Sequence, residues 1–145
     1  MSRSGYSDDC DGWQLIRWRG AVASAMRGQR GQAFLKEMLA AMDALPEKRL
    51  IADDLETPAT GMPFSTKGGE VCAIGSVGKA RGIDMAKVDP HEHEMVAAAF
   101  GIPHSLACEI MFWNDDWRSE TPEARFARMR KWIESQIVSA KAEAA

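Results

Sequence analysis

Cysteine is scarce in this sequence, and its pattern excludes a disulfide framework. Cys10, Cys72 and Cys108 are odd in number and far apart, and none of them belongs to a Cys-x-x-Cys pair. Disulfide-rich secreted domains and cysteine zinc sites instead place several cysteines at short, recognisable spacings. The three thiols are therefore expected to stay reduced, as they do in a cytosol.

Long hydrophobic runs are also missing. No apolar stretch approaches the roughly 20 residues that a helix needs to cross a bilayer. The first twelve residues, MSRSGYSDDCDG, carry no apolar segment after Arg3, so no signal peptide is expected. These absences predict a protein that works in the cytoplasm and has no membrane partner.

Catalytic motifs are absent too. Gly78-Lys79 is not a phosphate-binding loop, because Ala73 replaces the first glycine of that motif and Ala80 replaces the Ser or Thr that binds magnesium. There is no G-x-S-x-G around a serine. We therefore predict no catalytic residues and no cofactor, and the enzyme question is left open with a non-enzyme favoured.

The three histidines are candidate metal ligands. His91 and His93 are two residues apart, which on a helix places them about 200° around the axis, so they cannot hold one ion together. His104 and Cys108 are spaced i, i+4 and could form an imidazole–thiol pair. We favour the alternative, a buried cysteine beside a surface histidine, so no metal site is predicted.

The composition describes one domain with a real core. The 145 residues are 46% hydrophobic and 27% charged, which is typical of globular proteins. Residues 32–45 carry an apolar stripe at i, i+3, i+4, i+7 spacing, and Pro46 ends it. We expect a mainly α protein over residues 1–145, a compact bundle of about five or six helices with at most a small two-stranded β element around 48–52 and 70–74, an exposed loop at 57–69 and a frayed tail at 140–145.

Local signals place the helix ends. The first helix is expected to begin near Asp11, to bury Trp13, Ile16, Gly20 and Ala23, and to form an antiparallel hairpin with the second helix. Glycine followed by an apolar residue predicts helices that end at Arg81 and at Phe100. The second of these should start at Asp89 with Pro90 in the first turn, a further helix should span 103–114, and the last should start at Thr121.

Charge is unevenly distributed. The net charge is −3, which does not favour a general nucleic-acid binder. Residues 95–113 resemble a helix-turn-helix, but the would-be recognition helix carries acids and no cation. The stretch from 12 to 36 has no acid, and its arginines are the candidate phosphate contacts of an alternative nucleic-acid-binding function: Arg17, Arg19, Arg27 and Arg30.

The segment Trp113-Asn-Asp-Asp-Trp117 has the strongest functional character. Tryptophan is enriched at binding hot spots, and loops carry function more often than cores do. The alternative is that the rings close the core and the aspartates cap helices. Further acids such as Asp53 would be needed for a metal-dependent enzyme, the second alternative function. The candidate partner-contact residues are Trp18, Trp113, Asp115, Asp116 and Trp117.

Four segments resemble a known group of proteins. Gly12–Val22, Arg30–Leu35, Pro46–Leu50 and Gly69–Gly75 are similar to small uncharacterised proteins encoded by tailed phages and prophages. The resemblance covers most of the chain but transfers no catalytic residue. It implies an accessory gene product that acts in the cytoplasm of the host bacterium.

Together these observations predict a non-enzymatic accessory protein that binds a host protein or complex. An inhibitor of a bacterial defence system, of the anti-CRISPR kind, is one form that such a protein takes. A nucleic acid is the alternative partner. The small residues from Gly20 to Ala25 would also allow close approach of a second copy, as in a homodimer.

Overall fold

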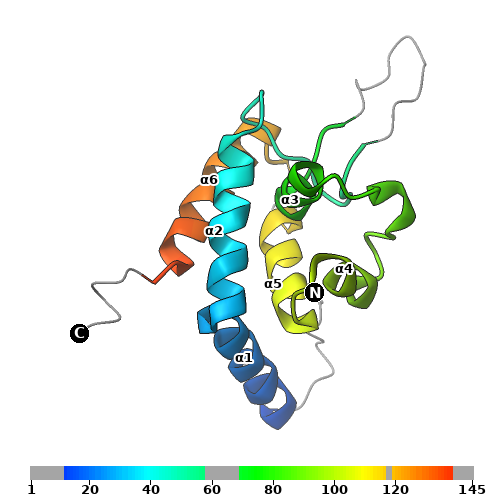
Figure 1. Ribbon diagram of the computed structural model, residues 1–145. Coiled ribbons are helices and arrows are strands. Elements are labelled where there is room, and N and C mark those ends of the chain that lie inside the picture. Colours follow the sequence, from blue (N-terminus) through cyan, green and yellow to red (C-terminus); the bar gives the residue numbers. More distant parts are fainter. Residues whose placement is uncertain (1–11, 58–68, 117–118, 139–145) are drawn as a thin grey trace.

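The computed structural model describes residues 12–57, 69–116 and 119–138, and these fold mainly into α-helices (Figure 1). The predicted mainly α bundle is confirmed. A short 3-10 helix, η1, joins the third and fourth α-helices. The elements are α1 (Gly12–Arg27), α2 (Gln29–Asp43), α3 (Ala73–Arg81), η1 (Met85–Lys87), α4 (His93–Phe100), α5 (His104–Asp115) and α6 (Pro122–Gln136).

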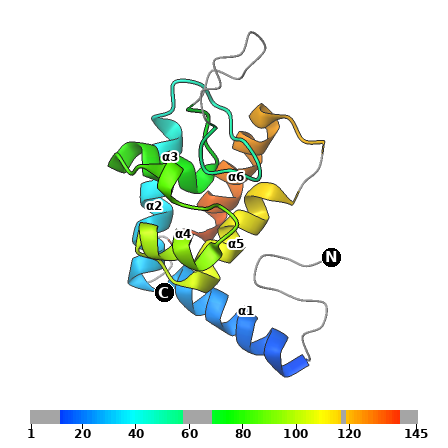
Figure 2. The same cartoon turned by 90° about the vertical axis from the view of Figure 1, so that its right-hand side faces the viewer.

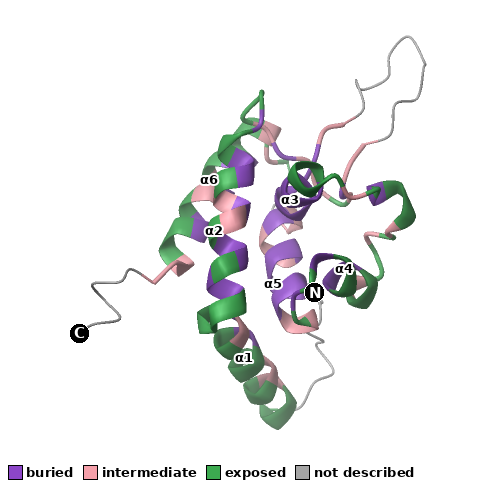
Figure 3. Ribbon diagram, viewed as in Figure 1, coloured by how far each residue is buried: buried purple, intermediate pink, exposed green. Residues whose placement is uncertain are grey.

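Helix α5 lies at the centre of the bundle. It packs against α1, α3, α4 and α6, while α2 covers α3 and α6. Leu106, Ala107 and Ile110 of α5 have no exposed surface. Figure 3 shows the buried residues of α2, α3 and α5 turned toward one another. The position of every other helix is therefore set by how it packs around α5 or α2.

Several predicted elements are confirmed. The apolar stripe of α2 is buried through Phe34, Leu35, Met38 and Met42. Helices α3 and α4 end at Arg81 and Phe100, and their caps Gly82 and Gly101 adopt φ of 73° and 69°. The following amides close both Schellman motifs, with Ile83 N–H donating to Gly78 O at 2.9 Å and Ile102 N–H to Ala97 O at 3.1 Å. Thr121 caps α6 as expected, its side chain accepting from Ala124 N–H.

The predicted antiparallel hairpin of the first two helices is wrong. Only Gly28 separates α1 from α2, and hydrogen bonds run through it from Gly28 N–H to Ser24 O and from Gln32 N–H to Gly28 O. A chain reversal needs a longer loop than one residue. Helix α1 instead leads away from the end of α2 and extends beyond the other helices (Figures 1 and 2).

The predicted buried face of α1 is also wrong. Trp13 and Ile16 are 73% and 63% exposed, and Gly20 and Ala23 are exposed as well. The face that packs on the core carries Val22 and Met26, which are buried, with Leu15 and Trp18 packed against them. This second stripe at i, i+3, i+7, i+11 holds larger apolar residues than the small-residue face that the prediction chose.

The β element is reduced to a single bridge. Glu56 pairs with Val71 in antiparallel fashion, and the described residues contain no strand. Ile51 N–H donates to Val71 O at 2.9 Å, so the predicted 48–52 segment does lie beside its expected partner. Residues 73–74 belong to α3, because the Cys72 thiol accepts from Gly75 N–H and starts that helix.

The prediction that Asp89 starts α4 is wrong. Its carboxylate accepts from His91 N–H at 2.9 Å, a local turn that competes with a helix cap, and the helix begins at His93 with Glu92 as its N-cap.

Three further predictions concern residues that the structure does not describe. The proposed cap at Asp11, most of the loop at 57–69 and the tail at 140–145 lie outside the described ranges. Among the described helices, none combines the length and apolar character needed to cross a bilayer, although α4 and α5 taken together across their 109° bend would meet those two criteria.

Candidate functional sites

The predicted contact residue Trp113 has partners inside the molecule. Its ring stacks on Trp132 of α6 with centroids 5.1 Å apart and planes 19° from parallel. Its Nε1–H donates to Glu109 Oε1 at 3.0 Å, one helical turn back along α5. Stacking of this kind holds both rings in one orientation. Trp113 therefore presents a fixed, half-buried surface.

Asn114 and Asp115 connect the end of α5 to the 51–55 segment and to α3. Asn114, which is 2% exposed, accepts from Ala73 N–H at 3.1 Å and donates to Ile51 O at 2.8 Å. Asp115 Oδ1 accepts from Asp53 N–H at 3.1 Å. Burial raises the pKa of Asp115 above its usual value, while the hydrogen bonds from Asn114 and Asp53 oppose that rise. This carboxylate therefore joins the end of α5 to residue 53.

Two arginines of α6 satisfy the last carbonyls of α5. Arg125 Nε donates to Asn114 O at 2.9 Å, and Arg128 Nη1 donates to Trp113 O at 2.6 Å. Glu120 in turn accepts from Arg128 at 2.7 and 2.8 Å, and this pairing holds the pKa of Glu120 below its usual value. The end of α5 is thus fixed by a charged network.

Asp116 and Trp117 are the two other partner contacts predicted at this end of α5. Asp116 is the partly buried C-cap residue of α5. Trp117 lies outside the described residues. A partner-binding role for either one stays a prediction.

A groove of about 450 Å³ runs between α1, α5 and α6. Its lining includes Arg19 and Arg27 of α1, Trp113 of α5 and Trp132 of α6. Glu109 also lines it. A groove lined by arginines and by stacked tryptophans suits a segment that combines an apolar side chain with an acidic one.

The exposed side of α1 continues this groove. Ile16 precedes Ala23 by seven residues and Arg27 by eleven, so at 3.6 residues per turn the three lie along one side of the helix. Ala23 and Arg27 line the groove, and Ile16 extends their row toward the N-terminal end of α1. The α1 face is defined here as Trp13, Ile16, Arg19, Ala23 and Arg27. Sequence reasoning missed Trp13 and Ile16 as surface residues because it placed them in the core.

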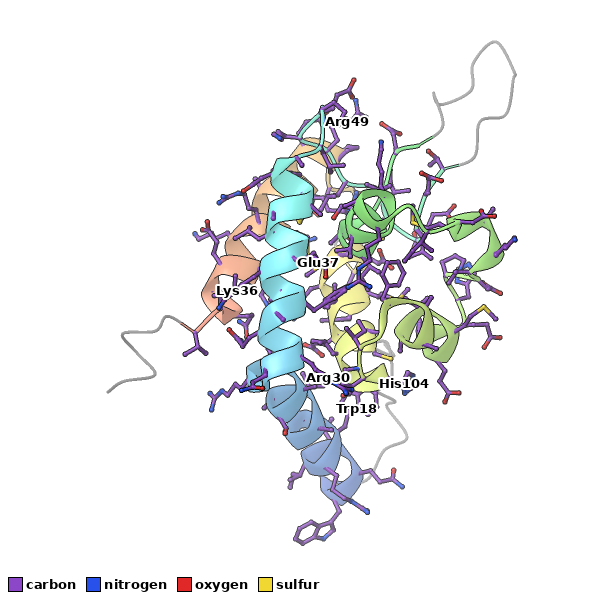
Figure 4. The ribbon with its side chains drawn as sticks, viewed as in Figure 1. Trp18, Arg30, Lys36, Glu37, Arg49 and His104 are labelled. Atoms are coloured by element: carbon purple, nitrogen blue, oxygen red, sulfur yellow. The ribbon has the colours of Figure 1, made fainter. Side chains whose placement is uncertain are left out.

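Trp18, another predicted contact, lies on the opposite margin of α1. It packs against the core, and its ring meets that of His104 edge-on, with centroids 5.8 Å apart and an interplanar angle of 80°. Figure 4 shows the two side chains together between α1 and the start of α5. Trp18 thus helps to hold α1 on α5.

His104 belongs to a cluster with His93 and Cys108. One imidazole nitrogen from each histidine and the Cys108 sulfur all lie within 4.8 Å of one another. Burial lowers the pKa of His93 and raises the pKa of Cys108 to about 11. The i, i+4 spacing in the sequence indicates the pair of His104 and Cys108. It does not indicate His93 as a third ligand, because spacing along one helix compares His93 only with His91. Sequence alone could not place α4 against α5.

No protein-family model, curated protein or solved structure matches this chain. The similarity to tailed-phage and prophage proteins therefore stays a prediction.

Proposed function

We propose that the protein is a non-enzymatic binding factor that uses the α1 face to hold a partner protein. The observation that carries the proposal is the exposure of Trp13 and Ile16, at 73% and 63%, on the end of α1 that extends beyond the bundle. A tryptophan and an isoleucine one turn apart form an apolar surface that water solvates poorly. The neighbouring Arg19 and Arg27 favour an acidic partner segment.

The partner that we propose is a protein of a bacterial host. The resemblance of the sequence to phage and prophage proteins supports this proposal, since it implies action in the host cytoplasm. A component of a defence system is one such target. The α1 face suits that role, since an aromatic anchor with flanking arginines has the composition of a binding hot spot. Trp113 belongs to the same surface through the groove, and Trp18 holds α1 on α5 from within. Asp115 instead bonds the end of α5 to residue 53.

The test compares two matched surface variants in an affinity capture from the host bacterium. Trp13→Ser combined with Ile16→Ser removes the apolar end of α1, whereas Met95→Ser removes an exposed apolar side chain, 46% exposed, from α4. We expect the α1 variant to bind the captured protein at least about tenfold more weakly, about 1.4 kcal/mol, because hot-spot truncations cost at least this much. Met95→Ser should bind like the natural chain. Equal binding by all three would refute the proposal.

The predicted contacts at the end of α5 are tested in the same assay. Trp117→Ala should leave the fold intact and weaken binding, if this residue is a contact as proposed. Circular dichroism of the variant checks the fold. Unchanged affinity would remove Trp117 from the proposed surface while leaving the α1 face untouched.

Nucleic acid is the second candidate partner, favoured by the exposed cations Arg17, Arg19, Arg27, Arg30 and Lys36. Arg17 and Arg19 are about 200° apart around α1, so one phosphate backbone cannot follow both. Helix α5 is too deeply buried to enter a major groove as a recognition helix. A gel shift whose affinity falls steeply with salt would favour nucleic acid over a protein partner.

A further inference from the structure

The first turns of α4 and α5 bring two histidines and a cysteine close together. His93 is the first residue of α4, and His104 and Cys108 lie one turn apart on one face of α5. The turn at 101–103 bends the chain by 109° between the two helices. Because this bend exceeds a right angle, the start of α4 is carried back toward the first turns of α5.

The donor set determines which ion fits. Two imidazole nitrogens and one sulfur are borderline-soft ligands, which suit zinc and not the oxygen-seeking magnesium or calcium. Zinc–ligand bonds of about 2.0–2.3 Å place tetrahedral donor atoms within about 4 Å of one another. The three donor atoms here are already within 4.8 Å, so small side-chain rotations would complete the set.

The surroundings of the cluster suit an ion that enters from solvent. Cys108 is fully buried, whereas His93 is partly exposed and gives access from the surface. Trp18 packs edge-on against the His104 ring and covers one side of it. The site thus has a buried sulfur at its base and histidines toward its opening.

We propose that His93, His104 and Cys108 form a zinc-binding site that fastens α4 to α5. Three protein ligands leave one position of the tetrahedron for water. The bound ion stabilises the folded chain, because the unfolded chain does not hold the three donors together. The site lies at the α4–α5 corner and is independent of the proposed partner surface on α1.

The experiment measures metal binding by tag-free protein. Reduced, metal-free protein is mixed with Zn²⁺, desalted and analysed for metal, and its thermal unfolding is followed with and without Zn²⁺. We expect one zinc per chain and a higher melting temperature. His93→Ala, His104→Ala and Cys108→Ala should each weaken binding at least about 100-fold, since loss of an outer-shell partner alone costs roughly 10–100-fold.

Two controls separate this site from adventitious binding. His91→Ala removes an exposed histidine two residues from the site and should bind zinc like the natural chain. Co²⁺ in place of zinc should give a sulfur-to-cobalt charge-transfer band that Cys108→Ala abolishes, even though Cys10 and Cys72 remain. Circular dichroism confirms that each variant folds. Absence of stoichiometric zinc, or equal loss of binding in His91→Ala, would overturn the proposal.

Discussion

At the scale of single residues, Asn114 is the side chain whose loss should cost most at the end of α5. It is buried and satisfies the Ala73 amide and the Ile51 carbonyl. Asn114→Ala should lower the free energy of unfolding by about 2–4 kcal/mol, because it removes the partner of a buried amide and of a partly buried carbonyl. Urea denaturation at neutral pH measures the loss.

The neighbouring Asp116→Asn is the matched control. It changes a partly buried aspartate at the helix end while preserving its shape, and should alter the unfolding free energy by less than about 0.5 kcal/mol. If both variants were equally stable, the hydrogen bonds of Asn114 would not be what holds the end of α5 to Ala73 and Ile51.

Residue-scale prediction from sequence succeeded where the partners are local. Gly82, Gly101 and Thr121 were identified as caps because their hydrogen bonds close within a few residues. Asn114 was not identified, because its partners lie 41 and 63 residues away in the chain. Asp89 was predicted wrongly as a cap although its partner is local, because its carboxylate accepts from His91 N–H in a turn that competes with a helix cap.

At the scale of elements, the junction of α1 and α2 depends on a close approach at Gly31. A Cβ at this position would lie 1.8 Å from the Ala25 carbonyl oxygen. Gly31→Ala should therefore destabilise the protein by about 1–3 kcal/mol despite the higher helix propensity of alanine. Chemical denaturation measures the change.

Gly20→Ala provides the opposite case within the same pair of helices. Nothing lies within 4 Å of a Cβ at position 20, so only helix propensity changes and the protein should gain about 0.5–1 kcal/mol. A stabilised Gly31→Ala variant would mean that the junction bends differently from the structure described here.

Element types were predictable from the sequence, whereas the orientation of α1 was not. The length and apolar stripe of α2 follow from spacing alone. In α1 two apolar stripes compete, and the choice between them depends on how α5 presents its surface. The same limit applies to the histidine–cysteine cluster, which requires α4 and α5 to meet at a known angle.

At the scale of the whole molecule, stability should fall in acid. Glu37, Asp43 and Glu120 pair with arginines that lower their pKa values, so their contribution is present above the ordinary pKa and is lost as the pH falls below it. Asp115 acts in the opposite direction, because burial raises its pKa and the folded chain gains stability as it is protonated.

Glu120 should dominate this pH dependence, because its side chain is only 13% exposed. Glu120→Gln should lose about 1–3 kcal/mol at neutral pH and show a flatter fall in stability below pH 4.5, the ordinary pKa of the group. Glu134 pairs with Arg130, and its side chain is 51% exposed. Glu134→Gln should therefore change the free energy of unfolding by less than about 0.5 kcal/mol. Thermal unfolding across pH 3–7 compares the three proteins, and identical profiles would exclude the role given to Glu120.

The central claim is that the exposed end of α1 touches a partner protein. The most direct measurement places a photo-crosslinking amino acid at position 13, or at position 95 as the control, in chains produced inside the host bacterium. We expect a covalent adduct with a host protein from position 13 and none from position 95. No adduct from position 13, or an adduct only between two copies of this chain, would contradict it.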